Sequence, residues 1–150
     1  MGFQGVYYNA IDAKGRASIP ARFREQLNGD DALVITQDRC AVVAYPLAEW
    51  ERFLKNFAAL PPEDALLRED LYFTHVSPAT RCAFDKQGRV QIPQSLREIC
   101  QLDTDGERDV VIVGVDRKIQ IWNKARYVAM QAEAEQRLAQ QRQRRLELGL

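Results

Sequence analysis

The chain has 150 residues, a length that fits one compact domain or two small ones. Hydrophobic residues make up 46% of it, so it can build a core, and the composition argues against global disorder. The net charge is zero, from 21 basic and 21 acidic residues, which argues against a strong non-specific nucleic-acid binder because such binding neutralises phosphates. No apolar run approaches the length of a membrane span, and the N-terminus lacks the pattern of a signal peptide.

The first predicted unit is built around a tight turn. An apolar run over 6–11 predicts a strand, and a second extended run covers 16–19. Between them, Asp12 favours a turn because its carboxylate can accept backbone N–H groups one or two residues on. Gly15 supplies the positive φ that a tight reversal needs. A short helix follows, and Pro20 suits its first position.

Strands and amphipathic helices alternate in the next part of the chain. The patterns predict a helix over 20–27, strands over 32–36 and 40–45 around a turn at 37–39, a helix over 46–59 and another over 63–73. The helix over 46–59 has an apolar face typical of a core contact, made of Leu47, Trp50, Phe53, Leu54 and Phe57. The helix over 63–73 presents Leu66, Leu67 and Leu71.

The turn occurs a second time, 73 residues further on. Asp85-Lys86-Gln87-Gly88-Arg89 repeats Asp12-Ala13-Lys14-Gly15-Arg16, and both continue through Ile-Pro into a predicted short helix. Residues 10–25 and 83–98 share eight identical positions of sixteen. Strands are then predicted over 110–113 and 118–122. The offset grows from 73 residues at the turns to 78 where Asp38-Arg39 recurs as Asp116-Arg117, so the loop over 102–109 holds five extra residues.

The last segment predicts one helix from Asn123 to Leu150, because it holds strong helix formers and no proline. Asn123 is a suitable N-cap residue. The apolar positions form a narrow stripe, made of Tyr127, Met130, Ala134 and Leu138. Beyond this stripe the helix is polar and basic, which predicts a solvated face or additional phosphate contacts.

An internal repeat of this kind means that the protein consists of two copies of one unit. We expect an α+β fold with a first unit over 6–53, a helical connector over 54–81, a second unit over 82–125 and a C-terminal helical tail over 126–150. One unit is too small to bury a good core, so the two should intertwine around a pseudo-twofold axis and share a barrel-like core. The connector belongs to neither repeat and should pack between them. Remaining edge strands favour association of neighbouring molecules, which closes into a ring if the rotation allows.

The repeated turn has two possible roles, and the residues alone leave the choice open. It can project Lys14 and Arg16 toward a partner, or Asp12 and Arg16 can form a structural ion pair. DNA binding by a neutral chain requires segregated charge. Residues 14–24 hold four cations and no acid, namely Lys14, Arg16, Arg22 and Arg24. Acids gather elsewhere, at Asp30-Asp31, Glu63-Asp64, Glu69-Asp70, Asp103 and Asp105.

Little in the sequence points to catalysis or metal binding. The single histidine, His75, predicts a partly buried structural residue before a turn. Cys40, Cys82 and Cys100 are odd in number and widely spaced, so we expect reduced thiols and no zinc site. No serine lies in a nucleophile-elbow pattern, and no glycine-rich loop could cradle a phosphate. We therefore expect no enzyme, no cofactor, no metal and no small-molecule substrate.

The doubled Asp-x-x-Gly-Arg pattern, each copy followed by Ile-Pro and a short helix, resembles the MraZ family of bacterial transcriptional regulators. The opening Phe3-Gln4-Gly5 and the run Tyr45-Pro46-Leu47-Ala48-Glu49-Trp50 also resemble that family, and the likeness extends from Phe3 to about Tyr127. The resemblance implies two AbrB-like (SpoVT-AbrB) swapped-hairpin units that form a pseudo-twofold β-barrel, and assembly into rings. It also implies binding to double-stranded DNA repeats in the promoter of a division and cell-wall gene cluster that includes the protein's own gene.

We expect the DNA contacts at Arg16, Lys14, Arg22, Arg24, Lys86 and Arg89. Asp12, Gly15, Asp85 and Gly88 are expected to shape the turns. The first copy is the more cationic, because its helix carries Arg22 where the second copy has Ser95, so Arg16 and Lys14 should carry most of the contact. The resemblance implies the same order, since the family's motif arginine maps onto Arg16. In a major groove, arginine reads guanine by a bidentate contact and lysine more often holds phosphate.

The sequence thus predicts a cytoplasmic, nucleoid-associated, ring-forming transcriptional regulator, and it leaves activation or repression open. The alternative is a ring-forming protein–protein interaction module, antitoxin-like or a scaffold, whose basic loops meet acidic partner surfaces. AbrB-like antitoxins bind a partner protein through a tail. Here the tail is a predicted helix and not a low-complexity arm, which weakens that version.

Overall fold

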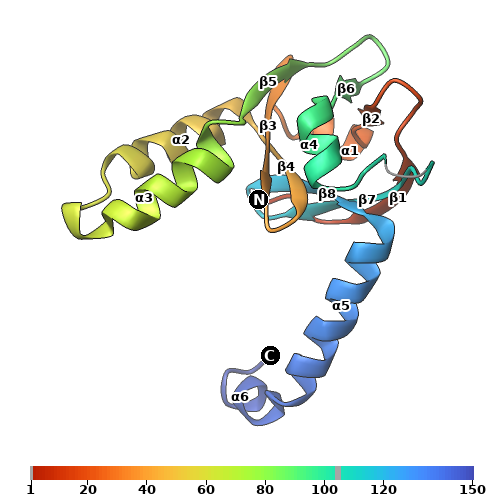
Figure 1. Cartoon of the computed structure of the whole chain (residues 1–150). Coiled ribbons are helices and arrows are strands. Elements are labelled where there is room, and N and C mark those ends of the chain that lie inside the picture. Colours follow the sequence, from red (N-terminus) through yellow and green to blue (C-terminus); the bar gives the residue numbers. More distant parts are fainter. Residues whose placement is uncertain (1, 104–105) are drawn as a thin grey trace.

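A computed structural model of the chain describes residues 2–103 and 106–150 (Figure 1). The fold is α+β, as predicted. The first unit contains β1 Val6–Ala10, β2 Arg16–Ser18, α1 Ala21–Glu25, β3 Ala32–Asp38 and β4 Ala41–Tyr45. The second unit repeats this order with β5 Thr80–Ala83, β6 Arg89–Gln91, α4 Gln94–Ile99, β7 Asp109–Val115 and β8 Lys118–Asn123. Positions 104 and 105 of the loop predicted over 102–109, including Asp105, lie outside the described residues.

The two units exchange strands. The first strand of each unit pairs antiparallel with the third strand of the other, β1 with β7 and β5 with β3. The resulting six-stranded sheet has the order β1-β7-β8-β4-β3-β5, and β2 and β6 form a separate two-stranded sheet. If each strand is replaced by its equivalent in the other unit (β1 by β5, β3 by β7, β4 by β8, and the reverse), the strand order of the six-stranded sheet is reversed. The two units are therefore related by a pseudo-twofold axis. Among the described residues, neither sheet closes on itself, so the predicted β-barrel is not confirmed.

One core serves both units. It contains Ile11, Ile19 and Phe23 from the first unit and Ile92 and Leu96 from the second, all with at most 2% of their surface exposed. Phe23 and Leu96 are equivalent positions of the repeat, one on α1 and one on α4. Each fully buried side chain of this size stabilises the fold by about 1.5–3 kcal/mol. Because the strands and the core are shared, neither unit has a complete core without the other.

The short helices begin one residue later than predicted. Pro20, Pro46 and Pro93 are N-cap residues with extended ψ values of 136°, 149° and 140°, and the helices start after them. The Pro20 carbonyl accepts the first helical hydrogen bonds, from the N–H groups of Phe23 and Arg24. A proline at the N-cap position costs the helix no hydrogen bond, because the N–H group that proline lacks would have had no helical partner there. The first helix also ends at Glu25 instead of Leu27.

The turn between β3 and β4 begins two residues later than predicted. Strand β3 continues to Asp38, which pairs with Ala41, so that Arg39 and Cys40 alone make the turn. Both have positive φ, 52° and 69°, as a two-residue hairpin turn of the type I′ kind requires. The prediction failed because no glycine marks this turn in the sequence.

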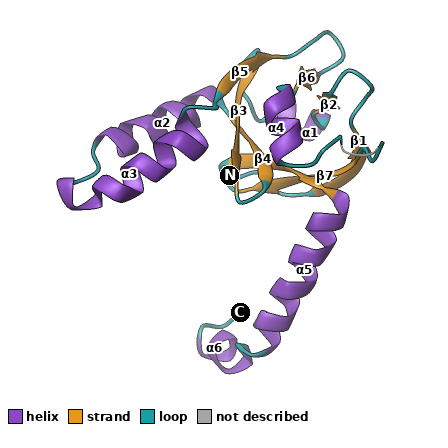
Figure 2. Ribbon diagram, viewed as in Figure 1, coloured by secondary structure: helices purple, strands orange, loops and turns teal. Residues whose placement is uncertain are grey.

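The connector is a helical hairpin that projects from the side of the first unit. The hairpin consists of α2 Leu47–Ala58, a 3-10 turn η1 Pro62–Asp64, α3 Ala65–Leu71 and a π-helical turn η2 Tyr72–Val76, so it begins within the range predicted for the first unit and not at position 54. Figure 2 shows α2 and α3 side by side, extending away from β3 and β5. The prediction that the connector packs between the units is therefore wrong. Its apolar side chains, including Leu47 and Trp50, instead cover Val34, Val43 and Tyr45 on the outer side of β3 and β4.

His75 anchors this connector to the sheet. It is 4% exposed, and its Nδ1–H donates to the Gln37 carbonyl at 2.8 Å, so Nε2 accepts from the Tyr45 hydroxyl at 2.9 Å. Tyr45, Trp50 and Phe53 surround the ring, with centroid distances of 4.9 to 5.7 Å. Burial lowers the pKa of His75, so the neutral ring fits this site. The predicted structural role is thus confirmed, and the burial is more complete than expected.

The C-terminal segment consists of two helices and not one. Helix α5, Lys124–Ala139, leaves the body beside β7 and β8, and α6, Arg142–Glu147, folds back at its far end (Figure 1). The Asn123 side chain accepts the N–H of Arg126 at 3.0 Å, which confirms the predicted N-cap. The break at 140–141 has no proline or glycine to announce it. Among the described residues, no helix has the length and apolar character needed to cross a membrane.

Candidate nucleic-acid interface

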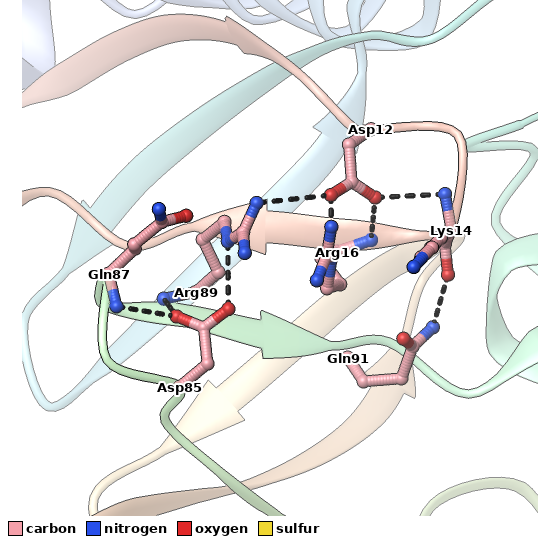
Figure 3. A network of polar contacts seen from close by, with 7 residues as sticks. All are labelled: Asp12, Lys14, Arg16, Asp85, Gln87, Arg89 and Gln91. Carbon is pink, nitrogen blue, oxygen red and sulfur yellow. Dashed lines mark hydrogen bonds and ion pairs between the residues drawn. The ribbon is translucent and has the colours of Figure 1, made fainter.

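The first repeated turn is held by the Asp12 carboxylate (Figure 3). Its Oδ1 accepts the backbone N–H groups of Lys14 at 3.0 Å and of Arg16 at 2.9 Å. Its Oδ2 accepts Nε of Arg16 at 2.6 Å. Gly15 has a φ of +81°, and its N–H donates to the Asp12 carbonyl at 3.0 Å. All these bonds lie within five consecutive residues, so the bonds made by Asp12 are local.

The second turn has the same construction. Asp85 Oδ1 accepts the N–H groups of Gln87 and Arg89, both at 2.9 Å, and its Oδ2 accepts Nε of Arg89 at 2.8 Å. Gly88 has a φ of +77°. The two middle positions differ in kind, Ala13-Lys14 in the first turn and Lys86-Gln87 in the second.

Both aspartates have a lowered pKa in the folded chain. The backbone N–H of Arg16 and, with it, the Arg16 side chain and the Lys14 N–H lower the pKa of Asp12 to about 2. The same groups of Arg89 and Gln87 lower the pKa of Asp85. Each turn therefore carries a fixed negative charge that orients its arginine.

The pairing of β2 with β6 joins the two turns through one short two-stranded ladder. Arg16 is opposite Gln91, and Ser18 is opposite Arg89, so the turns lie at opposite ends of a short ladder. The Gln91 amide donates to the Lys14 carbonyl at 2.6 Å. Nη1 of Arg89 lies 3.5 Å from Asp12 Oδ2. The arginines of both turns thus belong to one polar network, which Figure 3 shows from close by.

The two interpretations of Arg16 are compatible in this geometry. Arg16 pairs with Asp12 through Nε, and its side chain remains 29% exposed. Within the described residues, its two Nη groups have no hydrogen-bond or ion-pair partner, so they can face a ligand. Arg89 is 24% exposed and uses Nη1 as well as Nε in ion pairs. Of the two motif arginines, Arg16 is the more available.

The other predicted cations fall into two groups. All four are exposed, Lys14 and Lys86 in the turns and Arg22 and Arg24 on α1, and they differ in their contacts. Arg24 differs, because its Nε donates to the Ile19 carbonyl at 3.1 Å and its guanidinium lies against Gly88 of the second unit. Arg24 therefore stands beside the second turn and not beside the first.

Sequence reasoning missed Arg97. It is the counterpart of Arg24 on α4, and its guanidinium lies against Gly15 in the first turn. A signal existed, because Arg24-Glu25 recurs as Arg97-Glu98 at the same offset as the turns. That repetition did not reveal its meaning, since a helix residue gives no indication of which loop its side chain contacts.

Comparisons with known proteins identify the family to which the chain belongs. The family model described as "MraZ protein, putative antitoxin-like" matches residues 3–71 and 76–148. A protein of Syntrophotalea carbinolica named transcriptional regulator MraZ is 44% identical over 153 aligned positions, which cover 99% of each chain. Proteins with the same name from Desulfitobacterium hafniense and Geobacter sulfurreducens are 38% and 39% identical, covering 99% and 82% of this chain and 99% and 84% of their own.

Proposed function

Because the chain belongs to the MraZ family, we infer that it is a DNA-binding transcriptional regulator. We propose that it acts on repeats in the promoter of its own division and cell-wall gene cluster, in the cytoplasm and at the nucleoid. We also propose that it binds them as a ring, so that several identical turns engage several DNA repeats. Later contacts in such a ring are intramolecular, which turns weak single contacts into useful affinity.

The first turn is the observation that carries the DNA-binding proposal. Arg16 is aimed by Asp12 through Nε, and its two Nη groups remain for a partner. A guanidinium held in this way suits the bidentate contact with O6 and N7 of a guanine. Lys14, exposed in the same turn, suits a phosphate contact that positions the turn. Arg22 on the exposed side of α1 adds to the phosphate contacts in this proposal, and Lys86 and Arg89 provide a weaker second site.

Two arms of the molecule support association with neighbouring copies. The connector arm, residues 47–76, exposes Leu66 by 71% and Phe73 by 67%, and acids flank them at Glu63, Asp64, Glu69 and Asp70. The C-terminal arm, residues 124–147, exposes Leu146 by 66%, and its last helix carries Arg142, Arg144 and Arg145. The exposed apolar side chains of the connector arm are flanked by acids and those of the C-terminal arm by arginines, so the two arms have complementary surfaces. Since the arms leave the body in different directions (Figure 1), their contact would be head-to-tail, the kind that forms rings.

The organisation of the units is part of the same proposal. The exchange of β1 and β5 between the units supports a swapped-hairpin arrangement of the AbrB-like kind. We propose that the units span 6–53 and 82–125, with a connector over 54–81 and a tail over 126–150.

A gel-shift titration tests the function. The probe is a duplex from the region upstream of the gene that encodes this chain, and the control is a shuffled duplex of equal length. We expect a shift with the first duplex at a protein concentration that leaves the second unbound, and a weaker shift at higher salt. Binding to neither duplex at low salt would overturn the proposal in favour of the antitoxin-like or scaffold alternative.

Light scattering tests the ring. The wild type should have the mass of several copies, and replacement of Arg142, Arg144 and Arg145 by glutamate should lower that mass while the circular dichroism spectrum stays the same. An unchanged mass would show that the C-terminal arm does not make the contact. A wild-type monomer would overturn the ring itself.

A further inference from the structure

An arginine of the second unit lies directly over the first turn. A Cβ built on Gly15 would lie within 2.6 Å of Cζ, Nε and Nη1 of Arg97. The guanidinium therefore occupies the space where any other residue would carry a side chain. Gly15 is buried and lies between Lys14 and Arg16, the two cations that we place at the DNA.

Arg97 is held in this place from two sides. Its Nε donates to the Ile92 carbonyl at 3.0 Å, and its Nη1 lies 3.5 Å from Asp103 Oδ2. The Ile92 N–H in turn donates to the Gly15 carbonyl at 3.1 Å. The side chain is only 17% exposed. The Arg97 guanidinium is thus fixed by its own unit while it packs on the turn of the other.

The pseudo-twofold axis supplies a matched pair. Arg24 of the first unit donates Nε to the Ile19 carbonyl at 3.1 Å, and its guanidinium lies within 3.0 Å of a Cβ built on Gly88. Arg97 has an acidic partner, Asp103, whereas within the described residues Arg24 has no acid within ion-pair distance. The first turn therefore has the more firmly held arginine above it.

We infer that Arg97 is a positioning residue for the DNA-contacting turn of the first unit. It touches Gly15 and fixes the backbone that carries Lys14 and Arg16, and it takes no part in the DNA contact itself. This inference rests on the proposed function. Its physical basis is preorganisation, because a turn that is ordered before binding spares the conformational entropy that a mobile turn would lose on the DNA. The planar guanidinium with its fixed Nε–H is needed for this, and the round ammonium group of lysine cannot replace it.

The test compares Arg97→Ala with Arg24→Ala in the full chain. Hydrogen exchange of the backbone amides is measured over 13–16 and over 86–89, together with binding to the promoter duplex. We expect Arg97→Ala to speed exchange in the first turn and to weaken binding about tenfold, with the salt dependence of binding unchanged because no phosphate contact is lost. Arg24→Ala should speed exchange in the second turn and weaken binding less. Arg97→Lys should behave as Arg97→Ala does.

Each outcome decides between the inference and the function on which it rests. If the wild type fails to bind the duplex, the proposed function is wrong, whatever the exchange rates. If the wild type binds and Arg97→Ala binds equally well, or leaves exchange over 13–16 unchanged, the inference is wrong. Should Arg97→Ala not fold, Asp103→Asn removes the carboxylate charge beside Arg97 and should give a smaller effect in the same direction. Because Asp103 Oδ1 also lies 3.5 Å from Nε of Arg108, Arg108→Ala is its matched control and should leave exchange over 13–16 unchanged. No change with Asp103→Asn would also overturn the inference.

Discussion

Nη1 of Arg89 lies 3.5 Å from Oδ2 of Asp12, so an arginine of the second unit completes the surroundings of the first unit's carboxylate. Among the described residues, the reverse contact from Arg16 to Asp85 does not occur. The motif itself is the same in both units, with bonds that differ in length by no more than 0.2 Å. The pair Arg89–Asp12 therefore breaks the pseudo-twofold symmetry. Arg89 is thereby paired with two carboxylates, whereas Arg16 is paired with one.

Removal of Arg16 should separate DNA reading from folding. We expect Arg16→Ala to abolish specific binding to the promoter duplex in a gel shift while light scattering shows an unchanged assembly. A lost bidentate guanine contact costs about 1–3 kcal/mol at each site, and a ring multiplies this loss. Arg89→Ala is the matched control and should weaken binding less. Equal losses would show that both turns read DNA, and undiminished binding by Arg16→Ala would remove it from the interface.

Lys14→Ala should weaken binding by a similar factor for every DNA sequence, because a phosphate contact carries no sequence information. The slope of log affinity against log salt concentration should become shallower by about 1 for each site. Lys55→Ala, which removes an exposed lysine on α2, serves as the control and should leave the slope unchanged. A sequence-dependent loss with Lys14→Ala would instead assign a base contact to this lysine.

Gly15→Ala should destabilise the fold more than Gly29→Ala does. Both glycines have positive φ, +81° and +87°, which costs a residue with a Cβ roughly 1–2 kcal/mol. At Gly29 nothing lies within 4 Å of the added Cβ, whereas at Gly15 it would displace the Arg97 guanidinium. Urea unfolding of the two variants isolates the cost of that displacement. Equal free energies of unfolding would mean that Arg97 moves away without loss.

Acid should unfold the protein partly through the two turns. The pKa of Asp12 is lowered from 3.8 to about 2 in the folded chain, and that of Asp85 is also lowered. As the pH falls, these aspartates are protonated in the unfolded chain before they are protonated in the folded chain. The stability that the two ionised aspartates contribute is therefore fully present above about pH 4 and is lost as the pH falls through about 2. Asp12→Asn should show a shallower fall of the unfolding temperature between pH 4 and pH 2. A fall as steep as in the wild type would place the acid sensitivity elsewhere.

His75 should make the stability depend on pH in a higher range. Burial lowers its pKa from 6.5 against the opposing effects of the Gln37 carbonyl and Asp38, and Lys118 lowers it further. The unfolded chain therefore binds the proton more readily, and stability that is present above pH 6.5 is lost as the pH falls through the folded-state pKa. Thermal unfolding at pH 7.5 and pH 5.5 measures this loss. Since the chain has one histidine, His75→Phe should remove most of the difference, and its persistence would contradict the assignment.

The sequence by itself determined the two turns, the order of the elements in each unit and the cap at Asn123. All of these depend on contacts between residues a few positions apart. Asp12 bonds to groups no further than Arg16, and Asn123 bonds to Arg126. Side-chain type and spacing are enough to predict such contacts, and the internal repeat showed that the turn occurs twice.

Tertiary structure alone decided where these elements meet. Strand β1 finds its partner about a hundred residues away in β7, and no residue of β1 distinguishes β7 from another apolar strand. The connector packs on the outer side of β3 and β4 because His75 is buried there and Trp50 is partly buried there. For the same reason the sequence could not reveal that Arg97 of one unit covers Gly15 of the other. Long-range pairing depends on which apolar surfaces fit one another once the whole core forms, and that choice is made in three dimensions.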